Sequence, residues 1–436
     1  MDSVVSFQHN PYLKGMDLYY KPIFNAIVNK RWYFMAILNC IIGIIFVFLV
    51  AFLISNNKKK INWKTVIIGF LIQFIFAFAA LKWSVGKYIL SRISLGVQSV
   101  IDYAKEGISF IFGSLSNDGS IFAVNVLGVI IFISALVSVL YYLGVMQFVI
   151  KLIGGGLSKL LGTSKLETIS SAANIFLGQT EAPLLIKPYV EKLTESELFT
   201  VMVGGLASVS GSILVGYSLL GIPIEYLVSA SFMSAPAGLI ISKIIIPEIR
   251  EAKVNEEIEM VKDDSSNIVD AASKGAIDGL GLVLNIAAIL LAFVALIALI
   301  NGIIGLIGGL FGIDNLSLQS ILGYIFAPIA TIIGVPMKES VIAGSLIGQK
   351  IILNEFVAFT SLSEIISTLS PKTIAIVTFS LCGFANISSI AILIGGIGGM
   401  APSRKHDIAR LGWKAVLGGT LANLLSATIA GFLLTI

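Results

Sequence analysis

Long apolar runs, separated by short polar or charged connections, fill the chain from about residue 32 to its end. A run of about 20 apolar residues is long enough for a helix to cross the hydrocarbon core of a bilayer. Eight runs meet this requirement and predict eight transmembrane helices. Their approximate ranges are 32–54, 65–83, 121–143, 198–221, 226–246, 279–307, 373–396 and 413–436.

Three further stretches fit a spanning helix poorly. Residues 88–112 have a helical pattern but carry charged side chains, so we expect this helix to lie along the membrane surface. Residues 171–190 and 335–359 are apolar but are interrupted by Gly, Pro and polar residues. Irregular backbone is tolerated at membrane depth only where it is buried or lines a cavity, so these two stretches predict re-entrant hairpins. The expected fold is an all-α polytopic membrane protein.

Composition supports a membrane protein. Hydrophobic residues make up 56% of the 436 residues and charged residues only 12%, about half the charged share of an ordinary globular protein. This excludes a soluble enzyme, a disordered chain and a nucleic-acid binder. Cys40 and Cys382 lie in apolar stretches far apart and predict buried thiols, with no disulfide or metal site. His9 and His406 fall outside the apolar runs, so we expect no histidine at membrane depth.

The basic residues of the short connections predict the orientation, because cytoplasmic loops are enriched in Lys and Arg. Basic residues follow the first, third, fifth and seventh predicted spans: Lys58, Lys59, Lys60, Lys64, Lys151, Lys159, Lys165, Arg250, Lys253, Arg404, Lys405 and Arg410. We therefore expect both termini to be extracytoplasmic. The stretch 311–334 has no Lys or Arg and is predicted to be an external segment, and the charged run 251–264 a cytoplasmic connection. The tail 1–31 is basic, which disagrees with this orientation, and its role is not predicted.

Two short segments match each other and predict an internal repeat. Residues 205–210 read Gly-Leu-Ala-Ser-Val-Ser and residues 383–388 read Gly-Phe-Ala-Asn-Ile-Ser. Each segment lies mid-span, where its small and polar residues weaken the helix and free backbone carbonyls. Each also follows a predicted hairpin with an acidic residue, Glu181 or Glu355. A chance match among small residues is the alternative, but the shared order favours inverted repeats with a binding site at the membrane midplane. The expected division is a tail at 1–31, a scaffold at 32–165, a first repeat unit at 166–275, a scaffold span with an external segment at 276–334 and a second repeat unit at 335–436.

The two acidic residues are candidates for a binding site. A charged side chain at the bilayer centre costs about 2.5–3.5 kcal/mol on insertion scales. Glu181 and Glu355 either satisfy backbone donors freed at a hairpin bend or accept hydrogen bonds from a polar solute. The neighbouring polar residues are Gln179, Asn386, Ser388 and Ser389, and we expect no fixed positive charge among them. That set suits a neutral, hydroxyl-rich solute better than an anion.

Neutral oxygens in the first repeat unit suggest a second site. Asn174 and Ser208, together with carbonyls at a helix break, offer the oxygen ligands that small hard cations prefer. Phe384, close to Asn386, either covers a planar ring of the solute or packs in the core.

Three motifs together resemble the concentrative nucleoside transporters. They are Phe-Leu-Gly-Gln-Thr-Glu-Ala-Pro-Leu at 176–184, Asn-Glu-Phe-Val-Ala at 354–358 and Gly-Phe-Ala-Asn at 383–386. The resemblance extends from about residue 35 to the C-terminus. It implies a cell-membrane homotrimer whose subunits have eight core spans and two re-entrant hairpins, and which imports nucleosides with a cation gradient.

The resemblance also implies individual roles. Residues matching the family's base-binding positions are Gln179, Thr180 and Glu181, and Phe384 matches an aromatic contact to the base. Residues matching the ribose-binding positions are Glu355, Asn386 and Ser389. The family's sodium site matches Asn174 and Ser208 by side chain and Leu177 and Val209 by carbonyl. Some bacterial relatives couple to protons and depart from the Gln-Thr-Glu-Ala-Pro pattern, which this chain keeps, so sodium is favoured and the proton is the alternative.

Two other functions are compatible with the sequence alone. A proton-coupled nucleoside carrier would use one of the two glutamates as its proton acceptor. An intramembrane enzyme would use Glu181 and Glu355 as acid and base. The predicted membrane segments contain no histidine, paired cysteines or nucleophile motif, which argues against the enzyme. The expected partners are a nucleoside, the lipid bilayer and two further copies of the chain, with no nucleic acid and no organic cofactor.

Overall fold

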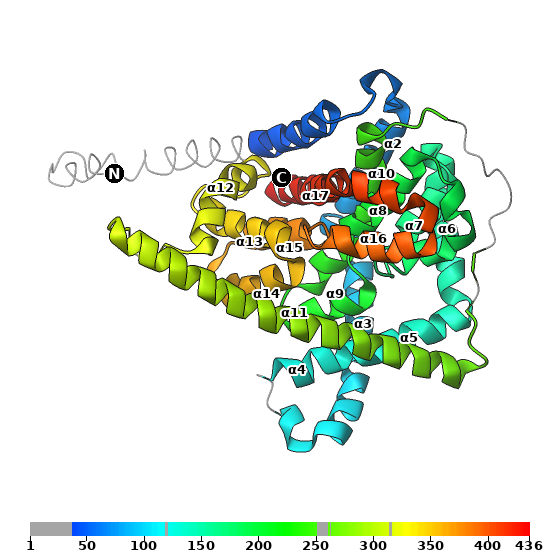
Figure 1. Ribbon diagram of the computed structural model, residues 1–436, viewed down its shortest axis with the longest axis horizontal. Helices are drawn as coiled ribbons and strands as arrows, with labels where there is room; N and C mark the ends of the chain where they lie inside the picture. Colours follow the sequence, from blue (N-terminus) through cyan, green and yellow to red (C-terminus); the bar gives the residue numbers. More distant parts are fainter. Residues whose placement is uncertain (1–36, 118–120, 251–259, 262, 314–315) are drawn as a thin grey trace.

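The computed structural model describes residues 37–117, 121–250, 260–261, 263–313 and 316–436. All regular elements in these ranges are helices, and Figure 1 shows them gathered around a central group, with the long helix α11 crossing one side. The tail 1–31, the start of the first predicted span and most of the charged connection 251–264 lie outside the described residues.

The first half of the chain contains mostly short and medium helices. A helix over Ile37–Leu53 is followed by η3 (Lys58–Lys60), α2 (Trp63–Leu81), α3 (Ser84–Phe112), η4 (Gly113–Asn117), α4 (Phe122–Asn125), α5 (Leu127–Tyr142), α6 (Val145–Leu161), α7 (Lys165–Ala173), η5 (Ala182–Lys192), α8 (Glu195–Ala207), α9 (Gly211–Leu219) and α10 (Ile224–Ile245).

The second half begins with the 43-residue helix α11 (Ile268–Leu310). It continues with α12 (Leu318–Ile332), α13 (Ser340–Ile352), α14 (Glu355–Ile365), η6 (Ile366–Thr368), α15 (Pro371–Leu381), α16 (Ser389–Met400), η7 (Pro402–Arg404) and α17 (Lys405–Thr435).

Six helical stretches in the described ranges are long and apolar enough to cross a membrane. They contain α2, α4 with α5, α8 with α9, α10, α11, and η7 with α17. The two remaining predicted spans are the helix Ile37–Leu53, whose predicted start lies outside the described residues, and residues 373–396, which form the separate helices α15 and α16. Residues 88–112 are helical as predicted, within α3. The count of eight spans stays a prediction.

Both matching hexapeptides interrupt a helix, as the sequence predicts. α8 ends at Ala207 before α9 begins at Gly211, and α15 ends at Leu381 before α16 begins at Ser389. The two breaks touch each other, because the Phe384 backbone N–H donates to the Ser208 carbonyl at 3.2 Å.

The first glycine of each hexapeptide permits close packing. A Cβ added at Gly205 would come within 3.0 Å of the Gln179 side chain. A Cβ added at Gly383 would collide with the side chain of Asn423 and the carbonyl of Leu206. Each glycine therefore lets a neighbouring segment approach its break.

The two predicted hairpins also contain breaks. α7 begins in a capping box, in which the Glu167 carboxylate accepts from the Ser164 backbone N–H at 2.9 Å, and it ends at Ala173, before an irregular segment over 174–181. In the second hairpin, α13 ends at Ile352 and α14 begins two residues later. The Asn354 side chain caps α14 by accepting from the Val357 backbone N–H at 2.8 Å.

Two helices occupy stretches that the sequence predicts as connections. Residues 311–334, predicted as an external segment, contain α12, which packs along α13. The two helices are so close that a Cβ added at Gly344 would lie only 2.7 Å from the Gly323 carbonyl oxygen. The basic connection after the third predicted span forms α6, bounded by Gly144 and Gly162 in the left-handed conformation. Both helices are shorter than a membrane span, so apolar length alone does not reveal them.

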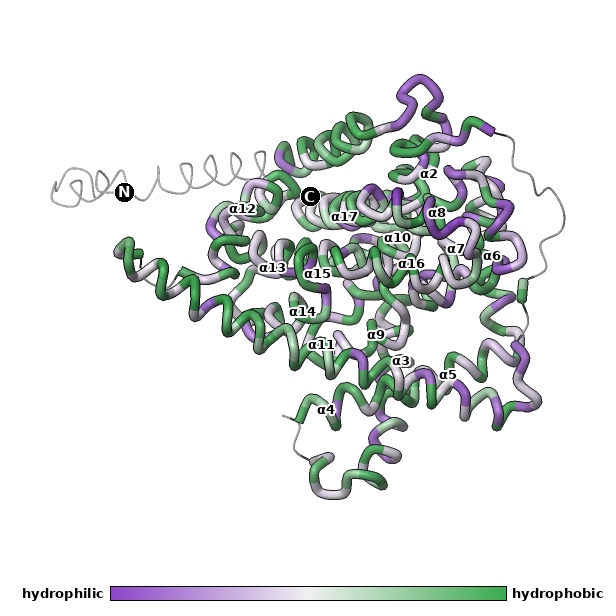
Figure 2. Tube along the Cα trace, viewed as in Figure 1, coloured by the Kyte–Doolittle hydropathy of each residue, from purple (hydrophilic) through white to green (hydrophobic). Residues whose placement is uncertain are grey.

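The core and the periphery differ sharply in burial. Three helical stretches are largely buried: the most apolar part is 89% buried in α8 with α9, in α10, and in η7 with α17. The most apolar part of α11 is only 11% buried. Figure 2 shows that α11 is nevertheless hydrophobic along most of its length. α11 therefore presents an exposed apolar surface. Cys40 and Cys382 are both fully buried, as predicted.

Candidate functional site

Glu355 lies at the centre of a buried hydrogen-bonded cluster. It is the first residue of α14 and only 6% exposed. The Tyr217 hydroxyl of α9 donates to one carboxylate oxygen at 3.2 Å, and the Asn386 side-chain amide donates to the other at 3.1 Å. The Tyr217 ring stacks on Phe359 with centroids 4.2 Å apart. The carboxylate is thus held in a fixed orientation by donors from two further segments.

Asn386 extends the cluster toward the first half of the chain. Its side-chain oxygen accepts from the Ser388 hydroxyl at 2.7 Å and from the Ser389 backbone N–H at 2.9 Å. The Ser389 hydroxyl donates to the Phe384 carbonyl at 2.6 Å and accepts a hydrogen bond from the Gln179 side-chain amide at 3.5 Å. The structure therefore brings together predicted site residues from both predicted repeat units.

The remaining site residues of the first predicted hairpin follow Gln179 along the chain. One oxygen of the exposed Glu181 carboxylate accepts from the Gly178 backbone N–H, and a Cβ at Gly178 would collide with this carboxylate. Glu181 therefore does satisfy a freed backbone donor, one of the two roles that the sequence leaves open. Thr180 packs against α16 at Gly396. The Gln179 side-chain oxygen is buried and has no hydrogen-bond donor in the described part of the chain.

The predicted cation ligands lie in the first hairpin and the first break. Asn174 directly follows α7 and is 1% exposed. Its amide nitrogen donates to the Ser170 carbonyl at 2.9 Å, whereas its side-chain oxygen finds no donor among the described residues. Ser208 is 1% exposed, and its hydroxyl lies 3.3 Å from the Val209 carbonyl.

A backbone contact joins the segments that carry these residues. The Gly211 N–H, just past the first break, donates to the Phe176 carbonyl at 2.9 Å. The half-buried Leu177 follows Phe176 in the irregular segment. The irregular segment and the first break are therefore neighbours.

Three residues that the sequence analysis missed belong to this region: Tyr217, Lys350 and Asn423. Lys350 is 1% exposed, donates to the Asn423 side-chain oxygen at 3.0 Å and interacts electrostatically with Glu355. The sequence analysis did not anticipate this buried lysine beside the cluster. Polar and charged side chains at membrane depth are rare and mark functional positions, and this signal was available at both Lys350 and Asn423.

The chain matches three descriptions of one family along most of its length. Residues 42–115 match "Na+ dependent nucleoside transporter N-terminus", residues 123–223 match "Nucleoside recognition" and residues 226–431 match "Na+ dependent nucleoside transporter C-terminus". The nucleoside permease NupC of Helicobacter pylori is 47% identical, over 90% of this chain and 96% of that protein. The chain belongs to the concentrative nucleoside transporter family.

Solved structures of this concentrative nucleoside transporter family have the same fold. CNTnw in an inward-facing substrate-bound state is 48% identical, with a TM-score of 0.87 over 91% of this chain and 98% of that one. A doubly substituted CNTnw in an outward-facing state has a TM-score of 0.89, over 92% of this chain and 98% of that one. The chain is therefore a nucleoside transporter of the membrane, and the prediction of a transporter rather than an enzyme is confirmed by the family.

Proposed function

We propose that this transporter imports nucleosides by symport with sodium. The hydrogen-bonded cluster around Glu355 is the main support, because it combines a buried carboxylate with amides and hydroxyls that can bind a neutral, hydroxyl-rich solute. The family description, which names sodium, supports the choice of cation.

In this proposal the second repeat unit binds the ribose. Glu355, Asn386 and Ser389 form hydrogen bonds with the sugar hydroxyls. A site built to bond a hydroxyl strongly rejects an analogue that lacks it, because buried polar groups are then left unpaired. Free nucleobases are therefore expected to be poor substrates, and uracil should not compete with uridine.

The first hairpin and Phe384 contact the base. Gln179 has a side-chain oxygen that lacks a donor in the described structure and suits an N–H of a base. Thr180 lies beside it, and Glu181 keeps one carboxylate oxygen that Gly178 does not use. The 8% exposure of Phe384 allows part of its ring to reach a ligand.

The sodium ion binds between the first hairpin and the first break. Its ligands are the side-chain oxygens of Asn174 and Ser208 and the carbonyls of Leu177 and Val209. The buried Asn174 oxygen supports this assignment, because a buried acceptor without a donor is costly and a cation would satisfy it.

The proposal includes a homotrimer with extracytoplasmic termini. The exposed apolar surface of α11 supports an interface with lipid or with other subunits. Native mass spectrometry from detergent micelles tests the trimer. Labelling of cysteines introduced next to Lys58 and Arg404 tests whether those loops are cytoplasmic.

Uptake of radiolabelled uridine into proteoliposomes tests the function. Vesicles are given an inward sodium gradient, or choline in its place, with and without a pH gradient. Sodium-dependent uptake that Glu355→Gln removes and Glu364→Gln retains supports the proposal; Glu364 is an exposed glutamate of the same helix. Uptake that ignores sodium but requires the pH gradient makes the carrier proton-coupled.

A further inference from the structure

Asn423 of α17 connects the two helix breaks at the centre of the protein. It is 2% exposed. Its amide nitrogen donates to the Ala207 carbonyl at 2.7 Å and to the Cys382 carbonyl at 3.0 Å. These are carbonyls at the C-terminal ends of α8 and α15, which would otherwise lack intrahelical donors. One side chain thus stabilises the end of a broken helix in each repeat unit.

Lys350 of α13 fixes the orientation of this amide. Its ammonium group lies 3.0 Å from the Asn423 side-chain oxygen. An ammonium group only donates, so the side-chain oxygen must face Lys350 and the two N–H groups must face the carbonyls. The orientation follows from the chemistry of the neighbours. All of the donors and the acceptor of the Asn423 side chain are then used.

The two carbonyls adjoin the two proposed binding sites. Ala207 directly precedes Ser208 and Val209, which are proposed to bind sodium, and Cys382 precedes the segment with Phe384 and Asn386. The bond from the Phe384 N–H to the Ser208 carbonyl links the same two breaks. A shift of either break therefore changes the geometry around Asn423 and is transmitted to the other break.

We propose that Asn423, oriented by Lys350, is the positioning residue that couples cation binding to nucleoside binding. The inference rests on the proposed sodium symport and adds the connection between its two sites. Coupling is a free energy shared by two ligands, so sodium changes the nucleoside affinity by the same factor by which the nucleoside changes the sodium affinity. That factor is the quantity that Asn423 determines.

A purely structural role for Asn423 predicts a different result. Loss of a structural hydrogen bond lowers stability, and weakens binding in sodium and in choline by the same factor. Ser426, three residues along α17, provides the matched control. It is also 2% exposed and accepts a hydrogen bond from the Gln73 side chain of α2 at 2.9 Å, away from both breaks. Ser426→Ala therefore removes a buried hydrogen bond of the same helix without touching either site.

Equilibrium binding to the purified, detergent-solubilised protein measures the coupling. The dissociation constant of radiolabelled uridine is determined in saturating sodium and in choline, with adenosine as the probe if uridine does not bind. The ratio of the two constants is expected to be at least about fivefold in the unmodified protein. We expect Asn423→Leu to lower the ratio below about twofold, Lys350→Met to give an intermediate ratio and Ser426→Ala to keep the original ratio.

Four outcomes overturn the inference. An Asn423→Leu protein that elutes as a folded species and keeps the full ratio excludes Asn423 as the coupling residue. If that variant does not fold, an unchanged ratio in Lys350→Met excludes the pair. An equal loss in Ser426→Ala shows that any buried polar bond of α17 has this effect. An unmodified protein that binds nucleoside with no sodium effect instead overturns the proposed sodium symport, and the inference with it.

Discussion

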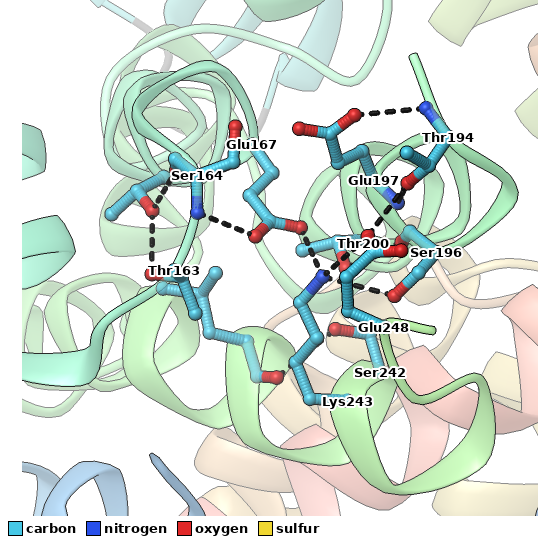
Figure 3. A network of polar contacts seen from close by, with 12 residues as sticks. Thr163, Ser164, Glu167, Thr194, Ser196, Glu197, Thr200, Ser242, Lys243 and Glu248 are labelled. Carbon is cyan, nitrogen blue, oxygen red and sulfur yellow. Dashed lines mark hydrogen bonds and ion pairs between the residues drawn. The ribbon is translucent and has the colours of Figure 1, made fainter. Parts of the chain in front are cut away.

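Two buried lysines, Lys243 and Lys350, are held in different ways. Lys243, in the last turn of α10, lies 2.6 Å from the Glu167 carboxylate of α7 and 2.9 Å from the Ser196 hydroxyl of α8, as Figure 3 shows. A second carboxylate, that of Glu248, lies 3.8 Å away. Lys350 instead donates to the neutral amide of Asn423 and interacts with Glu355 only electrostatically. One charge is directly paired and the other is not.

The surroundings of the two lysines extend this contrast. Glu167, a partner of Lys243, also belongs to the capping box at the start of α7, and Glu197 and Thr194 form the capping box of the neighbouring helix α8 (Figure 3). In the candidate site, by contrast, the side-chain oxygens of Asn174 and Gln179 have no donor in the part of the chain that the structure describes. In the first region the buried charges are paired with one another. The second leaves acceptors that a ligand can satisfy.

Removal of the Lys243 charge should have the largest effect on stability. Lys243→Met leaves the Glu167 carboxylate buried and unpaired, which lowers the free energy of unfolding by about 3–5 kcal/mol. The measurement is thermal or denaturant unfolding of the purified protein. Lys274→Met is the control, because Lys274 pairs with Asp264 at the surface and should be dispensable. Equal stability of the two variants would show that the buried ion pair of Lys243 does not stabilise the fold.

Loss of the Glu355 charge should affect binding instead of folding. Glu355→Gln keeps the shape of the side chain but removes the charge that strengthens its hydrogen bonds, so nucleoside affinity is expected to fall by about 10- to 100-fold. Equilibrium binding gives the affinity, and a melting curve tests whether the fold is retained. A Glu355→Gln protein with a much lower melting temperature, whose folded fraction still binds nucleoside normally, would show that Glu355 stabilises the fold, as Lys243 does, and does not bind the substrate.

A smaller effect is expected at Tyr217, the residue that orients Glu355. Tyr217→Phe removes the hydroxyl donor but keeps the stacking on Phe359, and should weaken nucleoside binding by roughly twofold to tenfold. Tyr226→Phe serves as the control, because Tyr226 lies on α10 beside Phe379, away from the Glu355 cluster. The same binding measurement applies. Equal affinities for both variants would show that the Tyr217 hydroxyl does not assist the carboxylate.

The smallest effect is expected at Leu177, where only the backbone carbonyl is proposed to act. Leu177→Met retains that carbonyl and most of the side-chain volume, so the sodium concentration giving half-maximal uptake should change by less than about twofold. Asn174→Leu, which removes a proposed side-chain ligand, should abolish the sodium response. A large change in Leu177→Met together with a normal response in Asn174→Leu would contradict the proposed ligand set.

The sequence allowed the interrupted helices to be predicted but not the contacts between them. Small and polar residues at 205–210 and 383–388 mark weak points within apolar runs, and both runs break there. The role of Lys350 was missed, because spacing along the chain does not show that α13 and α17 bring it against Asn423. Tyr217 was missed because an aromatic residue in an apolar run resembles core packing until the hydroxyl partner is known. Helix α12 was missed because it is shorter than a span.

The length of α11 has a consequence for the membrane around the protein. A helix of 43 residues is roughly 65 Å long, about twice the thickness of a bilayer's hydrocarbon core. Its predicted apolar section, residues 279–307, is itself longer than that core is thick. This helix must therefore lie obliquely in the bilayer, or the lipid beside it must thicken. We therefore expect short-chain lipids, which form a thinner bilayer, to strain the contact between α11 and the membrane.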